Sequence, residues 1–364
     1  MGEIKDLDVR IVGTKNEEEE LWRYLRLFSQ EKFVQEKMKN SHQEMKSDEL
    51  KNISFRISAC IKHAEEYYSA AKSVSLSTKP LLLYYGMYSL AKALIYFREP
   101  DIDTNSLKHH GLLYPQFDGT PEEFVNATTV LRPTGVFYHF SKYTQHDYCY
   151  FMATEIQAGD IESSFYLWQK AELDRFSEND EFILEELLKG IPELFDVSSL
   201  MGIIGMELYK ISLDLEKNIS GNWNRLLSFY KSKNNGFTKE LLLTKFPELR
   251  NDKEIVRETS DIISFDRSLY ENWKTLMPTE LVQSTSGGKF LASRDNQVSD
   301  MNANFIVMFI LSNIVRYKPP LWQEILDTKY KIIVETLVSN SERKFPHLIL
   351  NELFDEIIVF REDM

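Results

Sequence analysis

An arginine and a tyrosine close an apolar stretch late in the sequence, and together they could bind an anion. Arg316 and Tyr317 end the run that begins at Asp300, and Pro319 follows. A guanidinium presents five N–H donors in a planar fork that matches a carboxylate or a phosphate. The same position also suits a cation that stabilises the C-terminus of a helix and pairs with a carboxylate. The helix-end role is the simpler interpretation, and both residues are kept as ligand-binding candidates.

Two adjacent histidines, His109 and His110, precede Gly111 in a segment rich in turn-forming residues. Adjacent imidazoles cannot easily point at one metal ion, and no carboxylate stands at an obvious ligand spacing from them. We therefore expect no metal site and no cofactor here. His110 is kept as a third candidate ligand-binding residue.

An aromatic cluster follows, made of Tyr143, His146, Tyr148, Cys149, Tyr150 and Phe151. Such rings can stack on a nucleotide base, although packing on a core is their commoner role. Complete catalytic signatures are missing, since the sequence has no HExxH, no CxxC and no GxGxxG after a strand. The sequence therefore leaves open whether the protein is an enzyme.

Composition describes an ordinary globular chain of 364 residues, of which 43% are hydrophobic and 27% charged. The net charge of −13 repels phosphate backbones, so nucleic acid could bind only through a local site. Two cysteines favour a reducing compartment, and the first residues lack an apolar signal core. The apolar run Phe305–Leu311 is far shorter than the roughly 20 residues that cross a bilayer. We expect a soluble, cytoplasmic protein without membrane contact.

Hydrophobic periodicity predicts a helical N-terminal region. Asn16 caps a first helix, and a second runs over Asp48–Val74. A third begins at Ser77 or Thr78, with Pro80 in its first turn, and continues to Phe97. Because this third helix is apolar almost all round, we expect it to be buried, with Tyr84–Gly86 inside the molecule. The short link to the second helix predicts an antiparallel hairpin.

The rest of the chain alternates between turn-rich and helical stretches. Predicted strands form a hairpin of Ala127–Leu131 with Val136–Phe140 and a minor sheet of Ile262–Phe265 with Phe290–Ala292. Predicted helices are Asp180–Leu188, Ser199–Asn218, Asn222–Lys231, Asp300–Tyr317, Leu321–Leu337 and Leu348–Phe360. The expected fold is mainly α: a large helical body with a small irregular β-containing insertion. The expected regions are 1–100, 101–160 and 161–364.

Two longer pieces, Lys79–Ala93 and Leu311–Trp322, resemble the YaaC-like protein family of bacteria. Shorter pieces with a similar likeness are Ala64–Tyr68, His110–Leu112, Gly135–Phe137 and Ile191–Leu194. The resemblance therefore covers most of the chain. The family has no settled activity, so the resemblance implies membership without a mechanism.

The predicted helical hairpin is also similar to the first two helices of HEPN domains, which are α-helical modules of prokaryotic immunity and toxin systems. Many of these are dimeric, metal-independent RNases with an Arg followed at short spacing by a His. Arg56 and His63 match, with six residues between them, and on a helix they would lie about 20° apart on one face. The resemblance implies that Arg56 would stabilise charge at phosphorus and that His63 would move a proton. The simpler interpretation is a surface or capping role for both.

Two functions therefore remain. The preferred one is a non-catalytic helical interaction or accessory protein of the bacterial cytoplasm, acting through a protein partner or as a homodimer. The alternative is a HEPN-like metal-independent RNase or phage-defence effector that uses Arg56 and His63.

Overall fold

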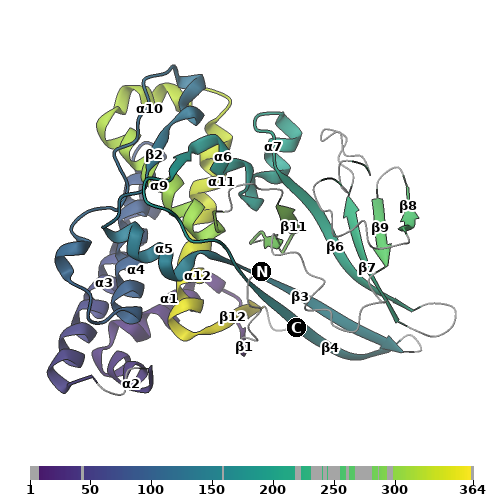
Figure 1. Cartoon of the computed structure of the whole chain (residues 1–364), viewed down its shortest axis with the longest axis horizontal. Coiled ribbons are helices and arrows are strands. Elements are labelled where there is room, and N and C mark those ends of the chain that lie inside the picture. The colour runs from purple at the N-terminus through teal and green to yellow at the C-terminus, as the bar shows by residue number, and fades with distance from the viewer. Residues whose placement is uncertain are drawn as a thin grey trace. The chain divides into compact units, whose positions relative to one another are not determined.

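A computed structural model shows how the chain is arranged (Figure 1). It describes residues 8–41, 45–157, 160–217, 223–230, 240, 244, 255–259, 262–266, 281–285, 287–292 and 298–361. The chain forms two compact units, each built from separate segments. We name them the helical unit (7–145, 174–187 and 301–364) and the β unit (1–6, 146–173 and 188–300).

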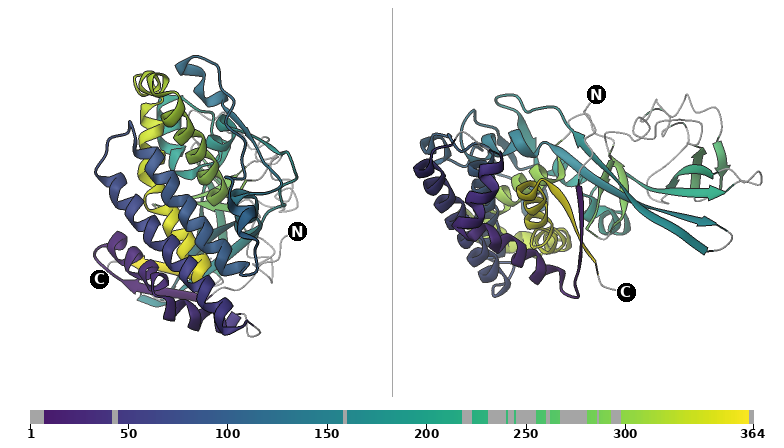
Figure 2. Two further views of the ribbon diagram at one scale, coloured as in Figure 1. Left: turned by 90° about the vertical axis from the view of Figure 1, so that its left-hand side faces the viewer. Right: turned by 90° about the horizontal axis from the view of Figure 1, so that it is seen from below.

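The helical unit contains most of the helices. These are α1 (Glu17–Leu25), α2 (Glu31–Ser41), α3 (Ser47–Lys72), α4 (Lys79–Arg98), α5 (Val136–Thr144), α9 (Asp300–Tyr317), α10 (Pro319–Leu326), α11 (Lys331–Ser341) and α12 (Lys344–Phe354). Short 3-10 turns are η1 (Arg26–Ser29), η2 (Thr104–Leu107) and η3 (Pro121–Asn126). Strands β1 (Asp8–Gly13) and β12 (Glu356–Arg361) pair in parallel, and Figure 2 shows them side by side. Strands β2 (Thr128–Val130) and β5 (Glu181–Ile183) pair antiparallel.

Helices α3 and α4 lie side by side and pack along each other in this unit (Figure 2). One stripe of α3 is buried and includes Ile53, Ile57, Ile61, Ala64 and Tyr68. Helix α4 is buried over most of its circumference, because apolar residues recur on every side of it. At their crossing, a Cβ atom on Gly86 would lie 2.6 Å from Cδ2 of Tyr68, so the glycine lets the two helices approach closely.

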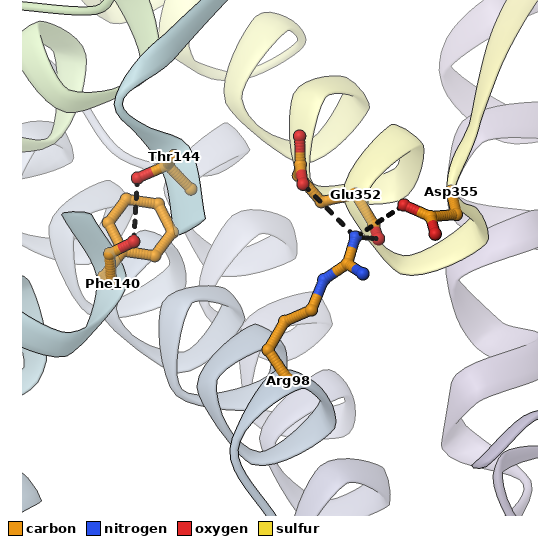
Figure 3. A network of polar contacts seen from close by, with 5 residues as sticks. All are labelled: Arg98, Phe140, Thr144, Glu352 and Asp355. Atoms are coloured by element: carbon orange, nitrogen blue, oxygen red, sulfur yellow. Dashed lines mark hydrogen bonds and ion pairs between the residues drawn. The ribbon is translucent and has the colours of Figure 1, made fainter. Parts of the chain in front are cut away.

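The C-terminal end of α4 is tied to the C-terminal end of α12 by Arg98 (Figure 3). The Nη2 atom of Arg98 donates to the backbone oxygen of Glu352 at 2.6 Å and to Oδ1 of Asp355 at 2.9 Å. Its cation lies where the last carbonyl groups of α12 concentrate negative partial charge. Arg98 therefore joins two helices that are more than 250 residues apart in sequence.

The β unit contains a long antiparallel ribbon and a six-stranded sheet. The ribbon pairs β3 (His146–Gln157) with β4 (Asp160–Glu172). The sheet has the order β10-β11-β6-β7-β9-β8, with antiparallel neighbours throughout. Its strands are β6 (Leu208–Lys217), β7 (Trp223–Tyr230), β8 (Ile255–Glu258), β9 (Ile262–Asp266), β10 (Leu281–Gln283) and β11 (Lys289–Ala292). Short helical pieces are η4 (Pro192–Leu194) and α7 (Phe195–Met201), whereas α6 (Leu184–Lys189) begins in the helical unit and ends in the β unit.

The prediction of a mainly α fold with small sheets is confirmed, and the bounds of α3, α4 and α9 lie within a few residues of those expected. Tyr84 and Gly86 are buried in α4, as expected. The proposed division of the chain at residues 100 and 160 stays a prediction. Within the part of the chain that the structure describes, no helix is long and apolar enough to cross a membrane.

Three secondary-structure predictions were wrong. Ser199–Asn218 and Asn222–Lys231 were expected to be helical, yet they contain β6 and β7. Apolar and polar residues alternate over Ile211–Glu216, which is the period of a strand, and this signal outweighs the helical one. Val136–Phe140 was expected to be a strand but begins α5.

Four further expectations need smaller corrections. The expected helix Asp180–Leu188 begins with strand β5, and the expected helix Leu321–Leu337 is divided between α10 and α11. The stretch Ile262–Phe265 and the stretch Phe290–Ala292 share one sheet, yet β6 and β7 lie between their strands. The final predicted helix ends at Phe354, and β12 follows it.

Candidate functional site

A pocket in the helical unit brings together all three ligand-binding candidates predicted from the sequence. Its volume is about 160 Å³, and it is lined by Leu81, Tyr84, Tyr85, His110, Leu112, Tyr114, Phe309, Ser312, Asn313, Arg316 and Tyr317. We call it the Tyr–Arg pocket. Its walls come from α4, from the segment 110–114 and from α9, so the fold gathers residues more than 200 positions apart.

Helix α9 contributes one face to the pocket. Its lining residues follow the spacing i, i+3, i+4, i+7 and i+8, and they are Phe309, Ser312, Asn313, Arg316 and Tyr317. Side chains at this spacing lie on the same side of an α-helix. Phe309 and Ser312 are buried, whereas Tyr317 at the helix end is 53% exposed. The face therefore runs from an apolar interior to a polar, exposed rim.

The segment that carries His110 is fixed by the start of α5. The backbone N–H of Val136 donates to the carbonyl oxygen of His109 at 2.9 Å, and that of Phe137 donates to His110 at 2.8 Å. This approach needs Gly135, because a Cβ atom there would lie 2.4 Å from the backbone nitrogen of Gly111. The first N–H groups of α5 thus hold His110 in place.

Arg316 lies in the last turn of α9, where it makes a hydrogen bond to one tyrosine and a cation–π contact with another. Its Nη1 atom donates to the hydroxyl oxygen of Tyr85 at 2.8 Å, and its Cζ atom lies 5.0 Å from the ring centroid of Tyr317. Within the part of the chain that the structure describes, no carboxylate pairs with Arg316. The helix-end role predicted from the sequence included such a carboxylate. Because none pairs with Arg316 among the described residues, N–H donors of its guanidinium remain unused.

His110 is half-buried among aromatic rings and shares a hydrogen bond with the hydroxyl group of one of them. Its Nδ1 atom lies 2.7 Å from the hydroxyl oxygen of Tyr84, and the ring of Phe309 lies 5.6 Å from its own. Burial lowers the pKa of His110, and the nearby cation of Arg316 lowers it further. Burial raises the pKa of Tyr84 well above its ordinary value. At neutral pH both groups are therefore uncharged.

Sequence reasoning missed several polar residues of the pocket. Tyr114 is 44% exposed and its ring lies 5.4 Å from that of Tyr317, so the two tyrosines form the rim. The hydroxyl of Ser312 donates to the backbone oxygen of Phe309 at 2.8 Å, as does the side-chain amide of Asn313. A signal was available, because Lys79–Ala93, His110–Leu112 and Leu311–Trp322 carry the family resemblance, and all three contribute to the pocket.

The pair predicted by the HEPN resemblance lies elsewhere, on α3. His63 is exposed, whereas Arg56 is half-buried, with its Nε atom 3.3 Å from Oδ1 of Asn52 and its Cζ atom 5.7 Å from the ring centroid of Tyr96. Among the described residues, no hydrogen bond or ion pair joins Arg56 to His63. The two share a helix face, separated by about 10 Å along the axis.

The aromatic cluster is only partly described. The hydroxyl of Tyr143 donates to Oε2 of Glu99 at 3.4 Å, and the ring of His146 lies 4.8 Å from that of Tyr148. The side chains of Cys149, Tyr150 and Phe151 lie outside the described residues. Base stacking by this cluster stays a prediction.

The fold and the Tyr–Arg pocket define a mainly helical protein whose small pocket combines tyrosines, one arginine and one histidine. The family model of the YaaC-like Protein matches residues 26–353, which is nearly the whole chain. The chain therefore belongs to the YaaC-like family, as its sequence suggested. Comparisons with curated proteins and with solved structures give no significant match.

Proposed function

We propose that this YaaC-like protein is a non-catalytic accessory protein of the bacterial cytoplasm that binds a small ligand in the Tyr–Arg pocket and acts through protein partners. The observation that carries the proposal is the convergence of Tyr84, His110 and Arg316 on one pocket, with Tyr84 buried at its inner end and Arg316 exposed at its mouth. A concave site with polar groups held at fixed positions is the usual form of a ligand pocket.

The hydrogen bonds within the pocket favour a ligand-binding role over a catalytic one. A nucleophilic serine needs a base within hydrogen-bond reach. The hydroxyl of Ser312 instead donates to the backbone oxygen of Phe309, and Nδ1 of His110 is occupied by Tyr84. Among the described residues that line the pocket, none is Asp, Glu, Lys or Cys. The polar groups are therefore arranged to hold a ligand rather than to move its protons.

Fluorine NMR with single-ring probes tests the binding step. At least one of para-fluorobenzamide, para-fluorobenzoate and para-fluorophenyl phosphate should show saturable binding to the purified protein, and the free spectra of all three should be unchanged after long incubation. Turnover of a probe, or no saturable binding by any of them, would contradict the proposal. A pull-down that recovers no protein, together with light scattering that shows only monomer, would contradict the partner role.

The exposed position of His63 on α3 favours one second candidate, a metal-independent RNase. Purified protein incubated with mixed RNA should then cleave it, and Arg56→Ala and His63→Ala should each remove the cleavage. Cleavage that survives both substitutions excludes these residues from the reaction. Because neither residue lines the Tyr–Arg pocket, the two candidate functions are tested independently.

A further inference from the structure

Charge in the Tyr–Arg pocket has one sign. Arg316 is the only residue with a permanent charge among those that line it, and no described carboxylate neutralises this cation. One of its N–H groups donates to the hydroxyl of Tyr85, which leaves the remaining donors of the fork for a ligand. A guanidinium in this state binds carboxylates and phosphates through paired, charge-assisted hydrogen bonds.

His110 supplies a second donor because of its bond to Tyr84. The hydroxyl of Tyr84 keeps its proton, and in the described part of the chain it has no other hydrogen-bond partner. If Nδ1 carried the imidazole proton, the buried hydroxyl hydrogen would have no acceptor, which costs about 1–3 kcal/mol. The hydroxyl therefore donates to Nδ1, and neutral His110 carries its proton on Nε2. Nε2 is then a donor without a partner among the described residues.

The size of the pocket limits the body of the ligand. A cavity of about 150 Å³ with apolar walls holds one benzene ring, and this pocket has about 160 Å³. Its apolar lining comes from Leu81, Leu112 and Phe309, while Tyr114 and Tyr317 stand at the rim. One ring fits the interior, and a polar group attached to that ring would remain near the exposed end of α9.

We infer that the ligand of the Tyr–Arg pocket is a small organic anion, with an apolar body the size of one ring and a carboxylate or phosphate held by Arg316. The inference rests on the proposed function, because it specifies the ligand of the same site. The unpaired guanidinium, the Nε2 donor of His110 and the absence of carboxylates from the described lining all favour an oxyanion. Carboxylate and phosphate both accept paired hydrogen bonds from a guanidinium, so the pocket could hold either group.

Three probes of equal ring size separate the possibilities by fluorine NMR: para-fluorobenzoate, para-fluorophenyl phosphate and neutral para-fluorobenzamide. We expect at least one anion to bind roughly tenfold more tightly than the amide. Arg316→Gln should remove this preference, and Arg316→Lys should keep part of it because the charge remains without the fork. Arg23→Gln is the matched control, since Arg23 is exposed on α1 and does not line the pocket.

The outcomes distinguish the inference from the proposed function. If the amide binds as tightly as the anions, or if the preference for anions survives Arg316→Gln, the inference is wrong while the pocket still binds a ligand. If none of the three probes binds, the proposed function fails with it. If only one anion is preferred, that arm identifies the group as carboxylate or phosphate. Circular dichroism of each variant establishes that it is folded.

Discussion

Replacing Gly86 with alanine tests the contact on which the helical unit depends. A Cβ atom at this position would lie 2.6 Å from Cδ2 and 2.7 Å from Cε2 of Tyr68, roughly 1 Å inside the normal carbon–carbon separation. The ring cannot move away easily, because Tyr68 is 2% exposed and its centroid lies 5.2 Å from that of Trp22.

The expected loss of stability follows from two opposing effects. Overpacking a core costs about 1–3 kcal/mol, and alanine in place of glycine within a helix gains about 1 kcal/mol. Gly86→Ala should therefore lower the free energy of unfolding by up to about 2 kcal/mol, as measured by urea denaturation followed at the helical circular dichroism band. Gly205→Ala is the control, because no heavy atom lies within 4 Å of a Cβ atom there.

A double mutant separates steric overlap from other causes. In a Tyr68→Leu background the ring is absent, so Gly86→Ala should become neutral or stabilising by about 1 kcal/mol. A Gly86→Ala protein more stable than the wild type, or an equal change in both backgrounds, would show that α3 and α4 do not approach each other in this way.

Three further predictions concern single groups. Tyr68→Phe should leave the free energy of unfolding unchanged or raise it by up to about 1 kcal/mol, because the buried hydroxyl has no hydrogen-bond partner among the described residues; a clear loss would contradict this. Arg98→Ala should cost about 2 kcal/mol in urea denaturation, since it removes the bonds to Glu352 and Asp355 at the end of α12, and Arg98→Lys should restore part of it. Sulfate, whose charge is constant between pH 5 and 8, should bind more tightly as pH falls, because an anion raises the lowered pKa of His110 and binding takes up a proton; a flat profile, or a slope that survives His110→Gln, would refute this.

Most of the helical unit could be predicted because its signals are local. The apolar run of α4, Pro80 in its first turn and the two prolines after Tyr317 define helix bounds without any tertiary information. Strand β6 was missed although its residues alternate between apolar and polar, because a ten-residue segment can also match part of a helical pattern.

The pocket could be predicted only residue by residue. Residue chemistry alone indicates Arg316, Tyr317 and His110 as candidates. About 200 residues separate His110 from the other two in the chain, so the sequence does not indicate that they line one pocket. For Arg56, the sequence predicts the position on a helix but not the side-chain contacts. Its spacing from His63 predicted a shared helix face, while its contacts with Asn52 and Tyr96 depend on rotamers and on packing that spacing does not determine.

Assembly of the helical unit from three chain segments has a consequence for its biosynthesis. Its first segment ends at residue 145, and its last begins at residue 301. A ribosome that adds roughly 5–20 residues per second needs about eight to thirty seconds to make the intervening part. During this interval α4 has been synthesised and α9 has not, and β1 lacks its partner strand β12 for longer still. The face of α4 that later packs on α11 and α12 thus lacks these partners at the stage when ribosome-associated chaperones can bind it.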